Sequence, residues 1–175
     1  MSGLLEQTIK CIEPVSAEYR VQAQKRCREQ AKPAGSLGMI EAIGIQLAAI
    51  RRSMDIHLRR RAVVTCAGDH GVVAEGVSQF PQEVTPKMVY NFVNGGASIN
   101  ALARACDTEV YVADLGVNHD FESELPIFHV KVARGTANMT QGPAMTRDQA
   151  VQAVEAGIRI VDELCADDEK GALDI

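Results

Sequence analysis

The sequence predicts an α/β fold: a mostly parallel sheet in three layers, preceded by a small accessory helical segment. Two apolar, β-branched runs, at residues 61–67 and 109–117, are typical of buried strands. Roughly 40 residues with helical patterns connect them, which is long enough for a right-handed βαβ crossover. The chain has 175 residues, of which 46% are hydrophobic and 23% charged, and this composition suits one packed domain with an accessory piece.

The N-terminal third has helical patterns. Ser16 is a suitable N-cap for a polar, charge-rich helix over residues 17–30. After a break at residues 32–35, Ser36 is predicted to cap a second helix over residues 37–53. That helix carries apolar residues at spacings of three and four, which form one amphipathic stripe: Ile40, Ile43, Leu47 and Ile50.

The crossover between the two strands contains two predicted helices. Thr85 is expected to cap the first, with Pro86 at its favoured first position and an end near Val93. A glycine pair at residues 95–96 then separates it from the second helix, at residues 97–105. The same glycines could present backbone N–H groups to an anion, and this alternative stays open beside a simple helix break.

The last third adds a short strand and a long helix. The strand is predicted at residues 128–132, and Thr146 is expected to begin a helix that runs to about Cys165. Residues 167–171 have the composition of a turn, and residues 172–175 that of the start of another strand. We therefore expect the chain to be the first half of a longer α/β domain.

Charge excludes one large class of function. The net charge of −5 gives no basic excess with which to bind nucleic acid. One local exception is a set of arginines at 51–52 and 59–61, on either side of His57. We interpret them as the solvated end of a helix and the approach to a strand, with a phosphate or partner patch as the alternative.

Cysteine content and hydropathy indicate the compartment. No signal peptide is visible, and no run approaches the roughly 20 apolar residues of a membrane span, so we expect a cytoplasmic protein with no membrane partner. Five scattered cysteines without a Cys-x-x-Cys pair predict reduced, buried thiols instead of disulfides or a zinc site. They are Cys11, Cys27, Cys66, Cys106 and Cys165.

The first strand ends at a candidate site. Asp69 and His70 lie between glycines directly after it, and ligands bind at the carboxyl ends of strands in open parallel sheets. The pair could be metal ligands or an acid/base pair. A catalytic metal needs about three ligands, and the other histidines have no suitable spacing, so we expect no metal. A structural alternative is that one of the two side chains bonds loop backbone.

Three residues after this loop could line a slot for a flat heterocycle. Phe80 lies in a loop and not on a periodic stripe, Gln82 follows it, and Met88 lies in the next helix. The alternative is that Phe80 fills a hydrophobic gap under the loop. Neither a Walker A pattern nor a dinucleotide-binding glycine motif occurs.

Several ordered motifs resemble one enzyme family. They are KPAGSLGMIE, AGDHGVVAEGVSQFPQEVT, NGGASINALAR, ADLGV and ARGTANMTQGPAMTRDQA, beginning at residues 32, 67, 94, 113 and 133. Together they resemble the nicotinate-nucleotide:dimethylbenzimidazole phosphoribosyltransferases over nearly the whole chain. Members of that family are about twice as long, so the resemblance covers their amino-terminal half. Residues 1–60 would be a helical accessory segment and lead-in helix, and residues 61–175 the first half of the catalytic domain.

The resemblance implies a Rossmann-like sheet, a small helical domain, a homodimer and a glycosyltransferase of cobalamin biosynthesis. The family moves the phosphoribosyl group of nicotinate mononucleotide onto dimethylbenzimidazole or a related base and uses no cofactor. Its catalytic glutamate and glycine-rich phosphate loop would lie beyond Ile175. The resemblance therefore implies that this chain alone is inactive. The alternative is a non-catalytic α/β module that binds bases or another chain.

The resemblance also assigns a base-binding wall to this chain. Its residues would be Ser78, Phe80, Gln82 and Met88, while Asp69 and His70 would shape the crevice floor. Some family members carry serine and glutamine where Phe80 and Met88 stand. The accepted base is therefore left open.

Overall fold

The computed structural model describes residues 3–166, so the turn and strand start expected at 167–171 and 172–175 lie outside the described residues. The described chain forms two compact units: a helical unit at Glu6–Leu58, and an α/β unit with residues 3–5 and 59–166. Within residues 3–166, no helix is long and apolar enough to cross a membrane.

Three parallel strands form the sheet of the α/β unit, in the order β1 (Ala62–Gly68), β2 (Glu109–Gly116) and β3 (Phe128–His129). The predicted α/β fold is thereby confirmed. Strand β1 pairs with β2 from Ala62↔Glu109 to Ala67↔Asp114, and the register then shifts so that Gly68 faces Gly116. The third strand is shorter than the predicted 128–132, since its regular pairing with β2 covers two residues. Beyond them the chain keeps single backbone bonds to β2, from the Val130 N–H to the Asp114 carbonyl and from the Val132 N–H to the Leu115 carbonyl.

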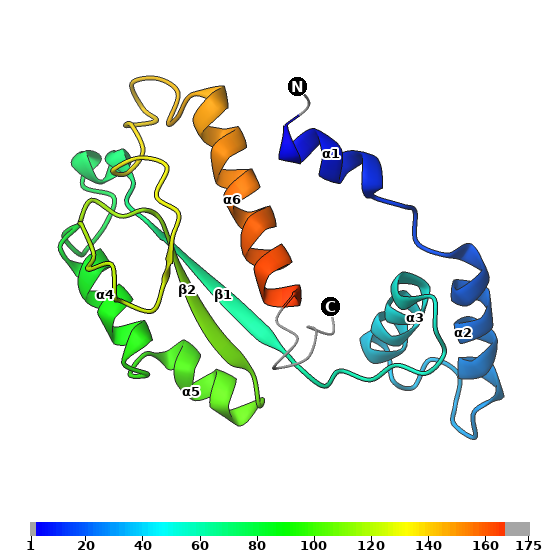
Figure 1. Cartoon of the computed structure of the whole chain (residues 1–175). Coiled ribbons are helices and arrows are strands. Elements are labelled where there is room, and N and C mark those ends of the chain that lie inside the picture. The colour runs from blue at the N-terminus through cyan, green and yellow to red at the C-terminus, as the bar shows by residue number, and fades with distance from the viewer. Residues whose placement is uncertain (1–2, 167–175) are drawn as a thin grey trace. The chain divides into compact units, whose positions relative to one another are not determined.

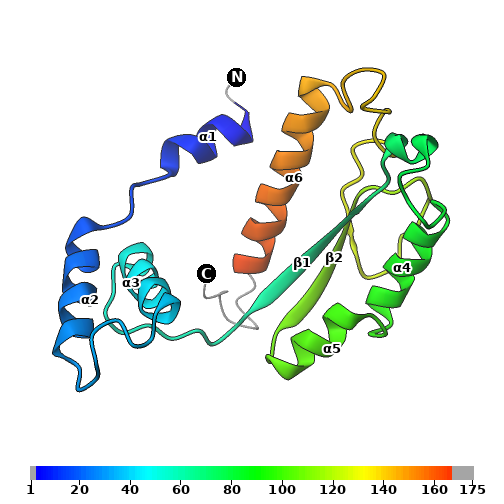
Figure 2. The same cartoon turned by 180° about the vertical axis from the view of Figure 1, so that it is seen from behind.

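Helices cover both faces of the sheet. In Figure 1, α4 (Val84–Val93) and α5 (Ser98–Ala105) lie on one face, and α6 (Arg147–Cys165) lies on the other. Figure 2 shows the same three layers from behind. Successive residues of a strand point to opposite faces, and the core follows this rule: Val112 packs with Val89 of α4, whereas Ala113 packs with Ile160 of α6. The buried apolar runs thus hold the two helical layers together.

Two predicted helix caps are wrong. Helix α3 spans Met39–Arg51. Its N-cap is Gly38, whose φ of 52° favours glycine, and not Ser36. The Glu41 carboxylate accepts the Leu37 N–H in that turn instead. Helix α4 begins after Glu83, so Thr85 already lies inside its first turn. The hydroxyl of Thr85 serves a tertiary contact, described below.

The predicted caps of the other two helices are confirmed. Ser16 accepts the Tyr19 N–H at the start of α2 (Ala17–Glu29), at 3.3 Å. At the start of α6, Thr146 accepts the Gln149 N–H while the Gln149 side chain accepts the Thr146 N–H, at 3.2 and 2.8 Å. This reciprocal pair is a capping box. The remaining helix, α1, spans Leu4–Cys11.

The amphipathic stripe of α3 is largely exposed among the described residues. Ile40, Ile43 and Ile50 are 68%, 52% and 48% exposed, and the buried residues of the helix are Ala48 and Ala49. Since the stripe is apolar and uncovered here, it forms an apolar surface of the helical unit.

Arg60 corrects the interpretation of the arginine run, which we expected to be solvated. Its side chain is 7% exposed and lies 3.0 Å from the Glu109 carboxylate. It also donates to the Tyr111 hydroxyl at 2.9 Å and to the Leu164 carbonyl at 3.0 Å. The adjacent Glu109 carboxylate raises the pKa of this guanidinium above its ordinary value. Arg60 therefore ties the start of β1 to β2 and to the end of α6.

The prediction of buried thiols is also wrong. Cys11, Cys66 and Cys106 are exposed, and Cys27 and Cys165 are half-buried. All five are free thiols in this structure.

Candidate functional site

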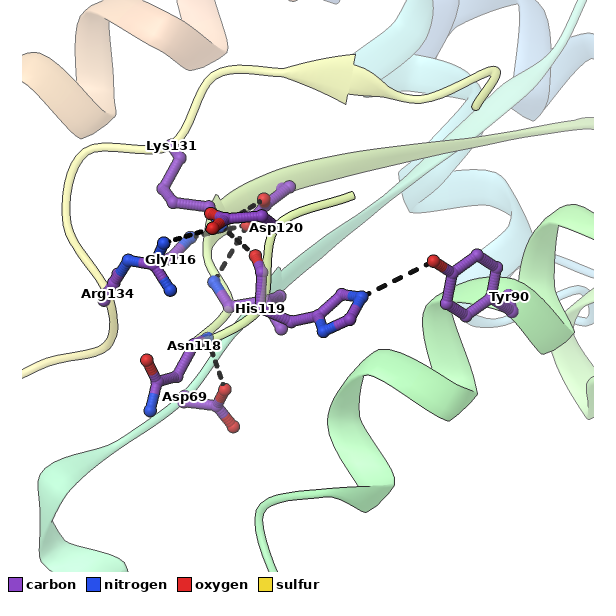
Figure 3. A network of polar contacts seen from close by, with 10 residues as sticks. Asp69, Tyr90, Gly116, Asn118, His119, Asp120, Lys131 and Arg134 are labelled. Atoms are coloured by element: carbon purple, nitrogen blue, oxygen red, sulfur yellow. Dashed lines mark hydrogen bonds and ion pairs between the residues drawn. The ribbon is translucent and has the colours of Figure 1, made fainter. Parts of the chain in front are cut away.

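Asp69 joins four segments at the carboxyl edge of the sheet. Its side chain is 5% exposed; one carboxylate oxygen accepts the Thr85 hydroxyl of α4, and the other accepts the Asn118 N–H after β2, both at 2.7 Å. Its backbone N–H donates to the Gly116 carbonyl, and its carbonyl accepts the Thr136 N–H, at 2.9 and 3.0 Å. Figure 3 shows the bond from Asn118. Because each oxygen accepts a hydrogen bond from a different segment, Asp69 is a structural tie at this edge.

His70 lies next to Asp69 but does not pair with it. It is exposed and precedes the short 3-10 helix η1 (Gly71–Glu75), and its carbonyl accepts the Gln82 side-chain amide at 3.4 Å. Among residues 3–166, no three or more His, Cys, Asp or Glu side chains are grouped so that they could hold a metal.

A hollow of about 660 Å³ lies between the end of β1, η1 and α4; we call it the base hollow. All four residues of the predicted wall line it, together with both crevice residues: Asp69, His70, Ser78, Phe80, Gln82 and Met88. The sequence analysis missed Val77 and Met139, which line it as well. Val77 directly precedes Ser78 in the sequence, so its neighbourhood was a signal for it. Met139 gives no such signal, because it reaches the hollow from a loop far along the chain.

Phe80 is presented to this hollow by its loop. The Ser78 hydroxyl accepts the Phe80 N–H at 3.1 Å and donates to the Phe80 carbonyl at 2.9 Å, which closes a tight serine turn. The ring remains 67% exposed. Phe80 therefore does not fill a gap under the loop, which removes that alternative.

A second hollow, of about 260 Å³, opens on the α6 side of the same strand ends. It shares residues 66–70 with the base hollow and is closed by Met145 and Gln149. The carboxyl edge of the sheet is thus concave on both faces, which is where open α/β sheets bind ligands.

Gly71 allows the two loops at this edge to approach closely. A Cβ placed on it would lie 2.6 to 2.7 Å from backbone atoms of Thr136, Ala137 and Asn138. We expect Gly71→Ala to lower the free energy of unfolding by about 1 to 3 kcal/mol, because one of the two backbones must move. Urea denaturation measures this, with Gly142→Ala as the control, since a Cβ there meets nothing within 4 Å. Equal effects of the two changes would contradict the close approach.

A polar network fixes the loop that follows β2 (Figure 3). Asp114 is 2% exposed and accepts the N–H groups of Gly116 and Val117 at 3.1 and 2.8 Å, while its other oxygen lies 3.1 Å from Lys131. Lys131 also donates to the His119 carbonyl. Asp114 and Lys131 therefore fix the loop that carries Asn118, and with it the position of the Asn118 N–H that bonds Asp69.

The outer part of this network is held by exposed pairs. Arg134 pairs with Asp120 and lowers the pKa of that carboxyl. Tyr90 of α4 donates to Glu122 at 2.7 Å, and this bond raises the pKa of the Tyr90 hydroxyl and lowers that of the Glu122 carboxyl. Helix α4 and the loop after β2 are thereby connected a second time.

The glycine pair at 95–96 is a helix break in this structure. Gly95 has a φ of 74°, and the Ala97 N–H at the start of α5 is already taken by the Asn100 side chain at 3.1 Å. The Ala97 N–H, which an anion at this helix start would need as a donor, therefore already has an acceptor within the chain.

Comparison with known proteins gives consistent matches. Residues 12–171 match the family model described as Phosphoribosyltransferase. The chain is 50% identical over 160 residues to the Geobacter sulfurreducens nicotinate-nucleotide–dimethylbenzimidazole phosphoribosyltransferase, covering 91% of this chain and 46% of that protein. The protein of the same name from Chloroflexus aggregans is 46% identical over 161 residues, covering 92% of this chain and 46% of that protein.

A solved structure agrees with these sequence matches. The crystal structure of CobT from Thermus thermophilus superimposes with a TM-score of 0.80 at 45% identity, over 86% of this chain and 45% of that one. The chain therefore spans a little under half the length of the proteins that it matches.

Proposed function

Because the chain belongs to the nicotinate-nucleotide–dimethylbenzimidazole phosphoribosyltransferase family, we propose that it supplies the base-binding half of such an enzyme in cobalamin biosynthesis. The substrates would be nicotinate mononucleotide and dimethylbenzimidazole or a related lower-ligand base. No cofactor would be required.

The base hollow is the observation that carries this proposal. Four residues proposed to bind the base, Ser78, Phe80, Gln82 and Met88, all line one concavity at the carboxyl edge of the sheet. Its volume of about 660 Å³ lies in the usual range of small-molecule sites. An exposed aromatic ring and a thioether suit the face of a flat heterocycle, which would cover the apolar surface that Phe80 leaves open.

The reaction would be a displacement at the anomeric carbon of the ribose. A ring nitrogen of the base would form a bond to that carbon as the bond to the nicotinate nitrogen breaks, and nicotinate would leave with the bonding electron pair. The base's other nitrogen would lose its proton to a carboxylate, and general-base assistance of this kind is typically worth about 10² to 10⁴ in rate.

The described part of the chain does not offer that carboxylate in the base hollow. Among the described residues, Asp69 is the one acid that lines it, and each of its carboxylate oxygens already accepts a hydrogen bond, from Thr85 and from Asn118. We propose that the general base and the phosphate grip come from the half of the relatives that this chain does not match.

This proposal has a direct test in two proteins. We expect the 175-residue chain alone to release no nicotinate from a mixture of nicotinate mononucleotide and dimethylbenzimidazole. A hybrid enzyme, in which this chain replaces the matched 46% of the Geobacter sulfurreducens relative, should release nicotinate and form the ribotide. Robust turnover by the chain alone would contradict the division of roles. Binding of the base by the chain with an inactive hybrid would favour a non-catalytic base-binding module.

We also propose that the protein associates as a homodimer. The apolar surface of α3, with Ile40 and Ile43 more than half exposed, suits a protein contact. Light scattering at high micromolar concentration should show an oligomer. The Ile40→Lys, Ile43→Lys double variant should shift it toward the monomer, while a monomeric unmodified chain would contradict the proposal.

A further inference from the structure

The loop at residues 138–140 is held against η1 by Glu75. One oxygen of the Glu75 carboxylate accepts the Asn138 side-chain amide at 2.6 Å and the Thr140 hydroxyl at 3.1 Å. The Thr140 hydroxyl also lies 2.8 Å from the Asn138 side-chain oxygen, and the Thr140 N–H donates to that oxygen at 3.0 Å. Glu75 and its two partners, separated by more than 60 residues in sequence, thus close one hydrogen-bonded clamp.

The clamp places Met139 at the base hollow. Met139 stands between the two clamp partners and lines the hollow together with Val77 and Phe80. All three side chains are more than half exposed, at 55%, 67% and 67%. Exposed apolar side chains gathered around one concavity indicate a surface that a ligand covers.

The same edge is reinforced by backbone packing. Gly71, the first residue of η1, lies so close to residues 136–138 that a side chain cannot fit between them. Gly71 N–H also donates to the Thr136 hydroxyl at 3.2 Å. The position of Met139 is therefore set from both ends of η1, by Gly71 at its start and by Glu75 at its end.

We propose that Met139 is a specificity-determining residue for the acceptor base and that Glu75 is the positioning residue that holds it there. This inference rests on the proposed function of the base hollow. A thioether is flexible and polarisable and contacts aromatic rings favourably, so Met139 completes, with Phe80, the apolar surround of a flat ring. Glu75 does not contact the base and acts through the loop.

Kinetics of the hybrid enzyme test the proposal, with each substrate varied in turn. Met139→Ala should raise the KM for dimethylbenzimidazole about tenfold and leave the KM for nicotinate mononucleotide within about twofold. Glu75→Ala should raise the base KM by a similar factor. Glu75→Gln should keep the base KM close to that of the unmodified hybrid, because an amide oxygen can accept the same two hydrogen bonds. Glu163→Ala, an exposed acid on α6, is the matched control and should change neither constant.

The double variant Glu75→Ala, Met139→Ala separates positioning from general damage. If Glu75 acts through Met139, the double variant binds the base no more weakly than Met139→Ala alone. Fully additive losses, or equal rises in both KM values, would overturn the proposal. If Phe80→Ala weakens base use and Met139→Ala does not, the proposed function stands and this inference fails. If the unmodified hybrid folds and binds nicotinate mononucleotide but uses no base, the proposed function fails with it.

Discussion

Replacing Asp69 with alanine should lower the free energy of unfolding of the α/β unit by about 3 kcal/mol. The Asn118 N–H and the Thr85 hydroxyl would both lose their acceptor, and an unsatisfied buried polar group costs about 1 to 3 kcal/mol. The Asp69 carboxylate is also one of the ties between α4 and the ends of β1 and β2. We therefore expect the base KM of the hybrid enzyme to rise as well, because Met88 of α4 loses its fixed position.

Asp69→Asn separates the hydrogen bonds from the charge. The amide oxygen of the new side chain can still accept the Asn118 N–H, and its NH₂ can donate to the Thr85 hydroxyl. The free energy of unfolding should therefore fall by about 1 kcal/mol. Asp162→Ala, an exposed acid on α6, is the control and should stay within about 0.5 kcal/mol of the unmodified chain. Urea denaturation of the four proteins gives the comparison. An Asp69→Ala chain as stable as the control would show that the ties are dispensable.

The layers of this fold could be predicted because their signal is local. The run that contains Val112 and Ala113 places apolar residues on both faces, which is typical of a strand buried between two helical layers. The Thr146 cap is equally local, since its partner Gln149 lies three residues away. The wrong caps show the limit of such signals. Thr85 has the right chemistry for a cap, but a tertiary partner, Asp69, competes for its hydroxyl.

The candidate site was predicted where the chain brings its residues together locally. Phe80, Gln82 and Met88 lie close together in the sequence and reach one hollow. Contacts across long sequence separations gave no signal: Glu75 meets Asn138, and Arg60 is buried against Glu109 although it stands in a run of arginines. A charge run is usually solvated, so its one buried member can be recognised only when the sheet is in place.

The strongest effect on base use is expected from Phe80→Ala. The ring is 67% exposed in this structure, so its loss should change the stability of the chain little. A bound flat base would bury one face of the ring, and burying an aromatic side chain contributes roughly 1.5–3 kcal/mol. We expect the KM of the hybrid enzyme for dimethylbenzimidazole to rise by about one to two orders of magnitude. The KM for nicotinate mononucleotide should change little, because its phosphate would be held elsewhere.

Two further variants test the chemistry of the same wall. Phe80→Leu keeps apolar volume without a π-face and should lose only part of the affinity for the base. Met88→Gln replaces a thioether by an amide, so it should shift preference toward acceptors with a polar edge. Kinetics with each substrate varied in turn distinguish the outcomes. Phe80→Ala could instead raise the KM for nicotinate mononucleotide and leave the KM for the base unchanged. The nucleotide, and not the base, would then bind in the hollow, because removing the Phe80 ring weakens only the substrate that packs against it.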